Sequence, residues 1–261
     1  MGTFVVTGSA SGMGRATAGQ LVQLGHDVIG VDLRDADVVA DLATSTGRQA
    51  AIEAVRRRTS ALDGIATFAG VGGATGRPAS LLVSLNYFGS VELIGGLQPL
   101  LAAAGSSSAL AISSNSTTCQ PGWDPQLVAA CLAGDEQAAR ETGDRGESFA
   151  AYPATKTAVA RWVRRHAPGP EWAGAGIRLN ALAPGLVETP FVAETRADPV
   201  LGELIGQFPL PLGRGAEPDE VAELAVFVLT RSGFLSGSVL LCDGGTEALL
   251  RPDDWPALWE L

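Results

Sequence analysis

A glycine-rich loop close to the beginning of the chain limits the possible fold more than any other feature. The apolar residues 3–8, TFVVTG, predict a β-strand that runs into glycines at positions 12 and 14 and then into a helical pattern. Glycine allows a tight turn there and lets the main chain approach a pyrophosphate, whose charge the N-terminus of the following helix would receive. The order of strand, glycine loop and helix therefore predicts a dinucleotide-binding fold.

An aspartate at the end of the second predicted strand supports this prediction. The glycine loop alone is weak support, because the chain contains 33 glycines and glycine is common in turns. Asp32, however, ends the predicted strand 27–32 and lies 18 residues after Gly14. A carboxylate there would hydrogen-bond the adenosine ribose hydroxyls and repel a 2′-phosphate, which favours NAD over NADP. The alternative is an ordinary turn aspartate.

Short apolar runs alternate with longer amphipathic segments along the chain, which is typical of a parallel sheet with crossover helices. The predicted strands are residues 3–8, 27–32, 37–42, 64–70, 109–114, 177–185 and 238–245. The predicted helices are residues 15–25, 47–58, 85–104, 156–167 and 218–230. We therefore expect an α/β Rossmann fold: a single domain over residues 1–261, with a seven-stranded parallel sheet and helices on both faces.

Residues 115–150 depart from this alternation. They contain one predicted helix, residues 125–142, followed by the glycine-rich stretch GDRGES. This segment reads as a helical insertion directly before Tyr152.

Tyr152 and Lys156, in the stretch YPATK, form a candidate pair for proton transfer. Side chains four residues apart lie on the same face of a helix, and Pro153 is a plausible first helical residue. An unperturbed phenol titrates near ~10, so work at neutral pH requires a nearby cation, which Lys156 would supply. The alternative is a chance pair on the first turn of an ordinary helix.

Composition excludes several classes of protein. The net charge of −10 and the lack of a basic cluster argue against nucleic acid. The chain enters an apolar strand directly, and no stretch approaches the length needed to cross a bilayer, so we expect a cytoplasmic protein without a membrane partner. No metal centre is expected, since the cysteines and histidines are few and widely spaced and the cysteines read as free thiols: Cys119, Cys131, Cys242, His26 and His166.

Taken together, these motifs resemble the short-chain dehydrogenase/reductase family. The resemblance rests on Thr7-Gly8-x-x-x-Gly12-x-Gly14 and on the downstream Tyr152-x-x-x-Lys156, and it covers essentially the whole chain. The stretches VIGVDLRDADVVADL and SLNYFGSVEL and the long insertion most resemble the bacterial 3-alpha-hydroxysteroid dehydrogenase/carbonyl reductase type.

The resemblance implies a catalytic set. It assigns Asn86, whose main-chain carbonyl would hold a relay water, together with Ser114, Tyr152 and Lys156. Ser114 and Tyr152 would hold the substrate oxygen, while Lys156 would lower the phenol pKa and bind the nicotinamide ribose. Ser113 is the alternative to Ser114. The family usually has about a dozen residues between serine and tyrosine, so the insertion accounts for the wider gap here and leaves the shape of the substrate pocket open.

The resemblance also implies NAD as the cofactor and a set of residues that contact it. These are Gly8, Ser11, Gly12, Met13, Gly14, Asp32, Leu33, Asp41, Leu42, Ala69, Gly70, Tyr152, Lys156, Pro184, Gly185, Val187 and Thr189. Asp41 would contact adenine, and Thr189 would bond the carboxamide. The stretch FAG at 68–70 departs from the usual NAG, so the structural asparagine is missing and the centre of the sheet is expected to be looser.

Substrate and assembly are less constrained. Apolar residues in the insertion and in the predicted lid, residues 190–212, favour a hydroxysteroid or bulky apolar ketone, although they would equally suit packing. The alternatives are a small alicyclic or aryl alcohol, a dihydrodiol, a 3-oxoacyl thioester, or a dinucleotide-binding protein without catalysis; a serine hydrolase lacks the G-x-S-x-G stretch it would need. By resemblance we expect a homodimer or homotetramer, in which the insertion would form a substrate cap or an interface, and Trp255 and Trp259 a subunit contact or a packed tail.

Overall fold

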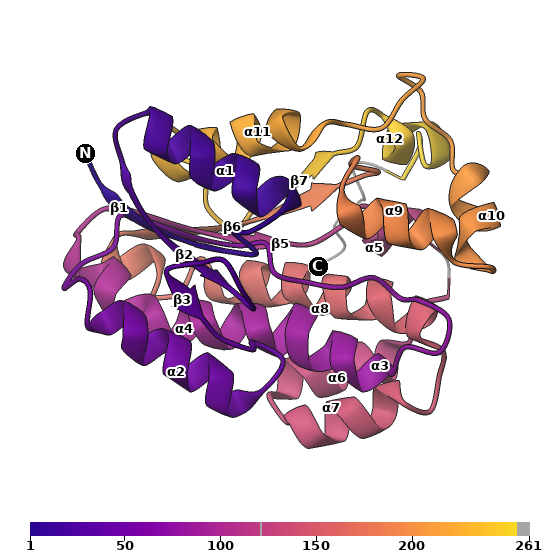
Figure 1. The fold of residues 1–261 in the computed structure, drawn as a ribbon, viewed down its shortest axis with the longest axis horizontal. Helices are drawn as coiled ribbons and strands as arrows, with labels where there is room; N and C mark the ends of the chain where they lie inside the picture. The colour runs from indigo at the N-terminus through magenta and orange to yellow at the C-terminus, as the bar shows by residue number, and fades with distance from the viewer. Residues whose placement is uncertain (121, 255–261) are drawn as a thin grey trace, which may run out of the picture.

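One parallel sheet organises the molecule (Figure 1). The structure, a computed structural model, describes residues 1–120 and 122–254. Its strands are β1 (Thr3–Thr7), β2 (Asp27–Asp32), β3 (Val38–Val39), β4 (Gly64–Thr67), β5 (Ser107–Ile112), β6 (Ile177–Pro184) and β7 (Val239–Cys242). They lie in the order β3-β2-β1-β4-β5-β6-β7, and every neighbouring pair is parallel. The predicted strands and the Rossmann fold class are confirmed, although β3 is only two residues long.

Helices cover both faces of the sheet. On one face lie α1 (Gly12–Gln23) and α11 (Pro218–Thr230), and on the other lie α2 (Ser45–Arg56), α4 (Gly89–Ala103) and α8 (Ser148–His166). Successive strand residues point to opposite faces: Phe4 and Val6 pack with Leu21 of α1, while Val5 belongs to the cluster that contains Leu97 of α4. Full burial of each such side chain is worth roughly 1.5–3 kcal/mol, and burial on both faces is why a continuous apolar run predicts a strand of this sheet.

The helical segment Ala79–Ala103 corrects one expectation. It comprises α3 (Ala79–Leu82), a π-helical turn η1 (Val83–Phe88) and α4. Among the described residues, this segment is long and apolar enough to cross a membrane by length and composition, with a window of mean hydropathy 1.3. The expectation that no stretch approaches that length is therefore wrong. Of the window, 72% is buried inside the protein, and buried core helices pass the same test.

The insertion forms several short helices rather than one. Its elements are α5 (Ser116–Cys119), α6 (Pro125–Ala133) and α7 (Glu136–Gly143). The prediction of a single helix over 125–142 is wrong because Gly134 adopts the left-handed conformation, with φ 78°, and ends α6. Asp135 then caps α7 by accepting a hydrogen bond of 3.0 Å from the main-chain N–H of Ala138.

The helix of Tyr152 begins earlier than predicted. Pro153 lies inside α8, whose first residue is Ser148, so its assignment as the first helical residue is wrong. Contacts from outside the helix hold the additional turn: the Ser148 hydroxyl donates 2.8 Å to the main-chain oxygen of Ala74. A side chain at Gly73 would come within 2.6 Å of the main chain of Phe149, so the two segments pack directly on each other.

The remaining elements follow β6 and the end of α8. They are η2 (Ala173–Ala175), α9 (Pro190–Ala197), α10 (Leu201–Gly206) and α12 (Thr246–Leu250). Trp255 and Trp259, predicted as a subunit contact or a packed tail, lie outside the described residues. The predicted lid, residues 190–212, contains α9 and α10 at one end of the molecule (Figure 1).

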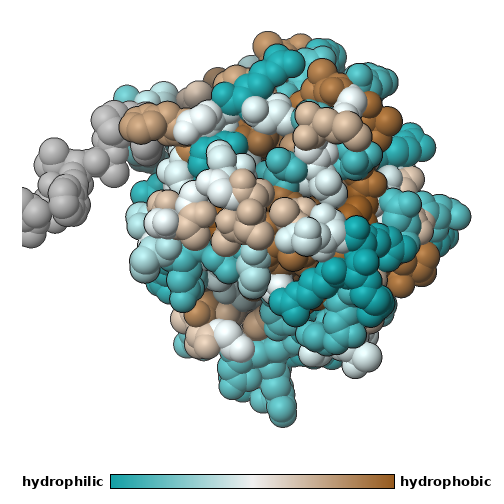
Figure 2. Space-filling view, turned by 90° about the vertical axis from the view of Figure 1, so that its left-hand side faces the viewer, coloured by the Kyte–Doolittle hydropathy of each residue, from teal (hydrophilic) through white to brown (hydrophobic). Residues whose placement is uncertain are grey.

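The surface shows no strong segregation of residue types on the side drawn in Figure 2. Hydrophilic and hydrophobic residues are interspersed there, and hydrophobic residues gather most densely toward the upper right. Exposed apolar residues are ordinary, because apolar atoms supply more than half of a folded protein's surface. This side therefore indicates no particular partner.

Candidate active site

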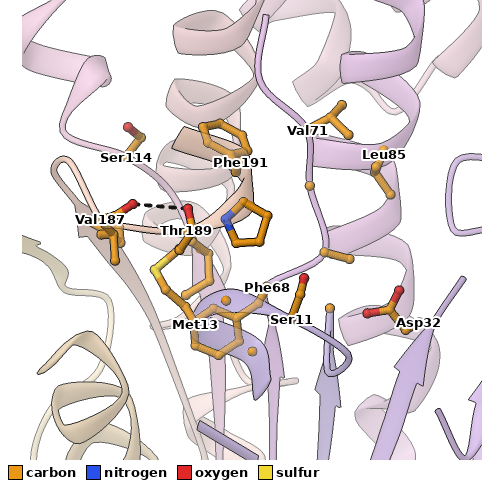
Figure 3. A pocket seen from close by; sticks show the side chains of 18 of the residues that line it. Ser11, Met13, Asp32, Phe68, Val71, Leu85, Ser114, Val187, Thr189 and Phe191 are labelled. Atoms are coloured by element: carbon orange, nitrogen blue, oxygen red, sulfur yellow. Dashed lines mark hydrogen bonds between the residues drawn. The ribbon is translucent and has the colours of Figure 1, made fainter. Parts of the chain in front are cut away.

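A cleft lies at the carboxyl ends of the strands, where loops following β1, β4, β5 and β6 meet (Figure 3). This is the place where the strand order reverses between β1 and β4, which is where open α/β sheets bind ligands. Every residue predicted to contact the dinucleotide lines it: Gly8, Ser11, Gly12, Met13, Gly14, Asp32, Leu33, Asp41, Leu42, Ala69, Gly70, Tyr152, Lys156, Pro184, Gly185, Val187 and Thr189. The structure thus brings the predicted set together, and the individual contacts stay predictions.

The glycine loop is shaped by contacts that only glycine permits. Gly8 has φ +66°, a left-handed conformation that favours glycine. A side chain on Gly14 would lie 2.2 Å from the main-chain oxygen of Gly8, so the first turn of α1 closes directly on the loop. Ser11 precedes α1 with extended backbone and makes no capping hydrogen bond through its side chain. The Ser11 side chain therefore leaves the N–H groups at the start of α1 available. Because residues 12–14 line the cleft, these N–H groups could bind a phosphate there.

Asp32 holds the glycine loop as well as lining the cleft. Its Oδ2 accepts a hydrogen bond of 3.0 Å from the N–H of Ala10, and its Oδ1 accepts one of 2.7 Å from the N–H of Leu33. The alternative interpretation of Asp32 as a turn residue is therefore partly correct. Its position in the cleft remains compatible with ribose binding, since each carboxylate oxygen has a second lone pair.

Ser114 and Ser113, the two candidates for the catalytic serine, are separated by their contacts. The Ser113 hydroxyl is buried and donates 2.9 Å to the main-chain oxygen of Lys156. The Ser114 side chain lies near enough to Tyr152 to lower the pKa of its phenol, and its hydroxyl accepts 3.1 Å from the N–H of Ser116. These contacts favour Ser114, because the Ser113 hydroxyl is occupied in holding the main chain of α8, while the catalytic role of Ser114 stays a prediction.

Burial dominates the electrostatics of the tyrosine and the lysine. Lys156 is 6% exposed, and its Nζ donates 2.9 Å to the main-chain oxygen of Ile112. Burial lowers the pKa of Lys156 to about 8. Burial also raises the pKa of Tyr152, and the hydrogen bond with Ser114 offsets this only in part. The expectation that Lys156 lowers the phenol pKa is thus not met in this structure, where Nζ lies 5.8 Å from the centre of the Tyr152 ring.

Asn86 is the predicted catalytic residue that does not line the cleft. It lies in the π-helical turn η1, a type of turn that is frequent at functional sites. Its side chain holds Val71: the carbonyl oxygen accepts 2.9 Å from the Val71 N–H, and the amide donates 2.9 Å to the Val71 oxygen. Asn86 therefore fixes the loop after β4, while the role predicted for its main-chain carbonyl stays a prediction.

The loop after β6 closes the cleft. Thr189 caps α9: its hydroxyl accepts 3.3 Å from the N–H of Val192 and donates 3.1 Å to the Val187 oxygen, the contact dashed in Figure 3. Phe191, which sequence reasoning missed, lines the cleft with its ring centre 5.9 Å from that of Tyr152. The signal for Phe191 was its position directly after the matched stretch APGLVETP.

Several other lining residues were also missed: Ala40, Phe68, Val71, Leu85, Ile112, Pro190 and Val192. Phe68 replaces the asparagine usual in the family. Its partly buried ring packs against the apolar cluster that contains Phe4 and Val6. Apolar packing therefore occupies this position, where the sequence predicted a looser sheet.

Among the described residues, no group of three or more His, Cys, Asp or Glu side chains is placed to hold a metal ion. The three cysteines are free thiols, and Cys131 is buried.

Comparison with known proteins identifies the family. A family profile described as "Enoyl-(Acyl carrier protein) reductase" matches residues 8–247. The 3-alpha-hydroxysteroid dehydrogenase/carbonyl reductase of Comamonas testosteroni is 38% identical over 97% of this chain and 99% of that protein. The chain belongs to the short-chain dehydrogenase/reductase family.

Two further proteins are similar to this chain over nearly its whole length. The crystal structure of the 3-alpha-hydroxysteroid dehydrogenase from Pseudomonas sp. B-0831 complexed with NADH superposes with a TM-score of 0.92 at 43% identity, covering 97% of this chain and all of that one. The cis-4-hydroxycyclohexanecarboxylate dehydrogenase of Sinomonas cyclohexanicum is 32% identical over 94% of this chain and 96% of that protein. The chain is thus an oxidoreductase that uses a nicotinamide dinucleotide, and the serine-hydrolase alternative falls away.

Proposed function

We propose that the chain is an NAD-dependent dehydrogenase that interconverts a secondary alcohol and a ketone, acting on a hydroxysteroid or a similarly bulky apolar carbonyl compound. One observation carries the reaction class: Ser114, Tyr152 and buried Lys156 lie in the same cleft as the glycine loop and Asp32. The substrate class is supported by the similarity to hydroxysteroid dehydrogenases over nearly the whole chain.

The residues of the cleft divide the work between binding and proton transfer. When bound, the dinucleotide supplies or takes up the hydride. Ser114 and Tyr152 hold the substrate oxygen, and the phenol, whose pKa is raised by burial, carries its proton at neutral pH. Tyr152 is therefore ready to donate that proton to a carbonyl oxygen during reduction, and it must lose the proton before it accepts one from an alcohol.

The preference for NAD rests on Asp32. Its carboxylate lies at the end of β2, where it would repel a 2′-phosphate and hydrogen-bond ribose hydroxyls. NADH is the cofactor named for the similar structure from Pseudomonas sp. B-0831. A cytoplasmic location and a homodimer or homotetramer remain predictions from the sequence.

A second candidate substrate is a small alicyclic hydroxy acid. The similarity to cis-4-hydroxycyclohexanecarboxylate dehydrogenase favours it, and Phe191 beside Tyr152 narrows the cleft at the reacting end. Both candidates use the same chemistry but differ in volume and in charge, because the hydroxy acid carries a carboxylate.

Absorbance at 340 nm tests the proposal directly. Purified protein is assayed with NAD or NADP and a panel of secondary alcohols that includes 3-alpha-hydroxysteroids and 4-hydroxycyclohexanecarboxylate, in parallel with Tyr152→Phe. Formation of NADH from steroids that is lost in the variant supports the proposal. Activity on the small alcohol alone selects the second candidate, a preference for NADP overturns the role of Asp32, and tight NADH binding without turnover favours a non-catalytic binding protein.

A further inference from the structure

A buried arginine connects the insertion to the rim of the cleft. The side chain of Arg48, on α2, is 1% exposed. Its Nε pairs with Glu92 of α4 at 2.6 Å, and its two terminal nitrogens bond both carboxylate oxygens of Glu136 on α7. A buried guanidinium is costly unless its charge is paired, and here two carboxylates from two different elements pair it.

The same guanidinium also binds a residue that lines the cleft. Nη1 of Arg48 donates 3.2 Å to the main-chain oxygen of Leu42. Leu42 follows β3, and β3 pairs with β2, so Leu42 lies on the side of the cleft where Asp32 ends its strand. An acid at the end of the second strand marks the adenosine end of a dinucleotide in this fold. Arg48 therefore fixes the main chain of Leu42, which lines the adenosine end of the cleft.

Two further hydrogen bonds attach α7 and the residue that follows it to the neighbouring elements η1 and α3. Arg140 donates 2.7 Å to the Ser84 hydroxyl in η1, and Asp144 accepts 2.8 Å from the N–H of Ser80 in α3. Figure 1 shows α7 on the same side of the sheet as α2 and α4, farther from the sheet than α6 and α8. Part of the insertion is thus connected, through Glu136 and Arg48, to a residue that lines the dinucleotide cleft.

We propose that Glu136 and Arg48 are positioning residues through which the insertion sets the geometry of the adenosine end of the cleft. Glu136 holds the guanidinium on the α7 side, and the guanidinium in turn holds the Leu42 carbonyl beside Asp41. This inference rests on the proposed function, namely that the cleft binds a nicotinamide dinucleotide. It concerns affinity at the adenosine end and leaves the chemistry at Tyr152 unchanged.

Glu136→Gln separates this role from simple attachment of α7. The amide removes the negative charge that orients Arg48. The guanidinium is then no longer held in position to donate its hydrogen bond to the main-chain oxygen of Leu42. We expect the dissociation constants of NADH and of AMP, from fluorescence and calorimetric titration, to rise roughly three- to thirtyfold. The dissociation constant of reduced nicotinamide mononucleotide, which lacks the adenosine, and kcat at saturating dinucleotide should stay unchanged.

Glu141→Gln is the matched control. Glu141 lies on the same helix, and its side chain accepts 3.1 Å from Gln137 instead of contacting Arg48. Its AMP affinity should equal that of the wild type. Glu136→Asp, which keeps the charge but shortens the side chain, provides a second test if Glu136→Gln unfolds, and it should weaken AMP binding in the same direction.

Three outcomes would overturn the inference: unchanged AMP affinity in folded Glu136→Gln or Glu136→Asp, an equal loss in Glu141→Gln, or an equal loss for the mononucleotide. Wild-type protein that binds no NADH would instead overturn the proposed function, and this inference with it. The wild-type titration therefore tells the two failures apart.

Discussion

The side-chain amide of Gln120 donates a hydrogen bond of 2.9 Å to the main-chain oxygen of Phe149. In a regular helix that oxygen would accept from the N–H of residue 153, but Pro153 has no N–H. The insertion therefore supplies, from Gln120, the donor that the proline removes. This contact lies one turn before Tyr152 and explains how a proline is accommodated inside α8.

This relationship predicts a coupling between two substitutions. Gln120→Ala leaves the Phe149 oxygen without its protein donor and should lower the free energy of unfolding by about 1 kcal/mol. In a Pro153→Ala background, the main chain at position 153 provides the N–H, so the same substitution should cost much less. Chemical denaturation of the four proteins measures the coupling, and equal costs in both backgrounds would contradict it.

Ser114→Ala should change the pH dependence of alcohol oxidation. The hydrogen bond with Ser114 lowers the Tyr152 pKa, which burial raises, so its loss moves the phenol pKa further upward. Because oxidation requires the deprotonated phenol, the rising limb of the kcat profile should shift to higher pH, and kcat should fall roughly 100-fold.

Ser113→Ala provides the comparison for that experiment. Its hydroxyl bonds the main chain of Lys156, so the variant should lose about 1 kcal/mol of stability while its pH profile stays in place. A profile that shifts equally in both variants would contradict the different roles assigned to the two serines.

Lys156→Met should change the pH dependence of stability in protein without dinucleotide. Burial lowers the pKa of Lys156 to about 8, whereas the unfolded chain keeps the ordinary value, so the unfolded state binds more protons between these values. The Lys156 contribution to stability should therefore rise with pH by up to about 3 kcal/mol from about pH 8 to about pH 10.5, against the opposite contribution of groups whose pKa burial raises, such as Cys131 and Tyr152. Lys156→Met should lack this rise in urea denaturation at pH 7, 8.5 and 10, and parallel curves would refute the prediction.

Asp32→Asn should relax the choice of cofactor. Removing the carboxylate charge removes the repulsion of a 2′-phosphate, and kcat/KM for NADP relative to NAD should rise roughly ten- to hundredfold. Asn has one acceptor oxygen, so one of the main-chain bonds to Ala10 and Leu33 also loses its partner.

Asp37→Ala controls for that structural loss. Asp37 accepts 2.8 Å from the N–H of Gly30 in β2 but does not line the cleft. It should lower the melting temperature without changing the cofactor ratio. An equal change of the ratio in Asp37→Ala would show that Asp32 acts through the loop and not through its charge.

Thr75→Val tests the predicted lid, residues 190–212. Asp198, between α9 and α10, accepts 2.7 Å from the Thr75 N–H and 2.9 Å from its hydroxyl. Hydrogen bonds from Leu201 and Thr75 lower the pKa of Asp198, so the carboxylate stays ionised at neutral pH. Loss of the hydroxyl should raise the substrate KM roughly two- to tenfold and leave NADH affinity unchanged.

Thr195→Val serves as the control for the lid. The Thr195 hydroxyl bonds the Phe191 oxygen at 3.0 Å within α9 and does not cross to the loop after β4. Its substrate KM should stay close to that of the wild type. A larger effect in Thr195→Val than in Thr75→Val would place the control of substrate entry inside α9.

Local patterns in the sequence determined most of the fold and the outline of the site. Strand and helix periodicity, glycine at positions 8, 12 and 14, and the acid Asp32 at a strand end all depend on neighbours within a few residues. The fold class followed from these patterns, whereas most of the predicted dinucleotide residues were assigned by the resemblance to the short-chain dehydrogenase/reductase family. The placement of Tyr152 and Lys156 on the same face of a helix could be predicted for the same reason, because helical spacing is a local property.

The tertiary structure decided what depends on residues distant in the chain. It placed the start of α8 at Ser148, because Ala74 and Gly73 pack on that turn. It assigned different partners to Ser113 and Ser114, and burial set the directions in which the pKa values of Tyr152 and Lys156 move. Desolvation and hydrogen bonding across elements depend on the packed surroundings of a group, and no short stretch of sequence contains those surroundings.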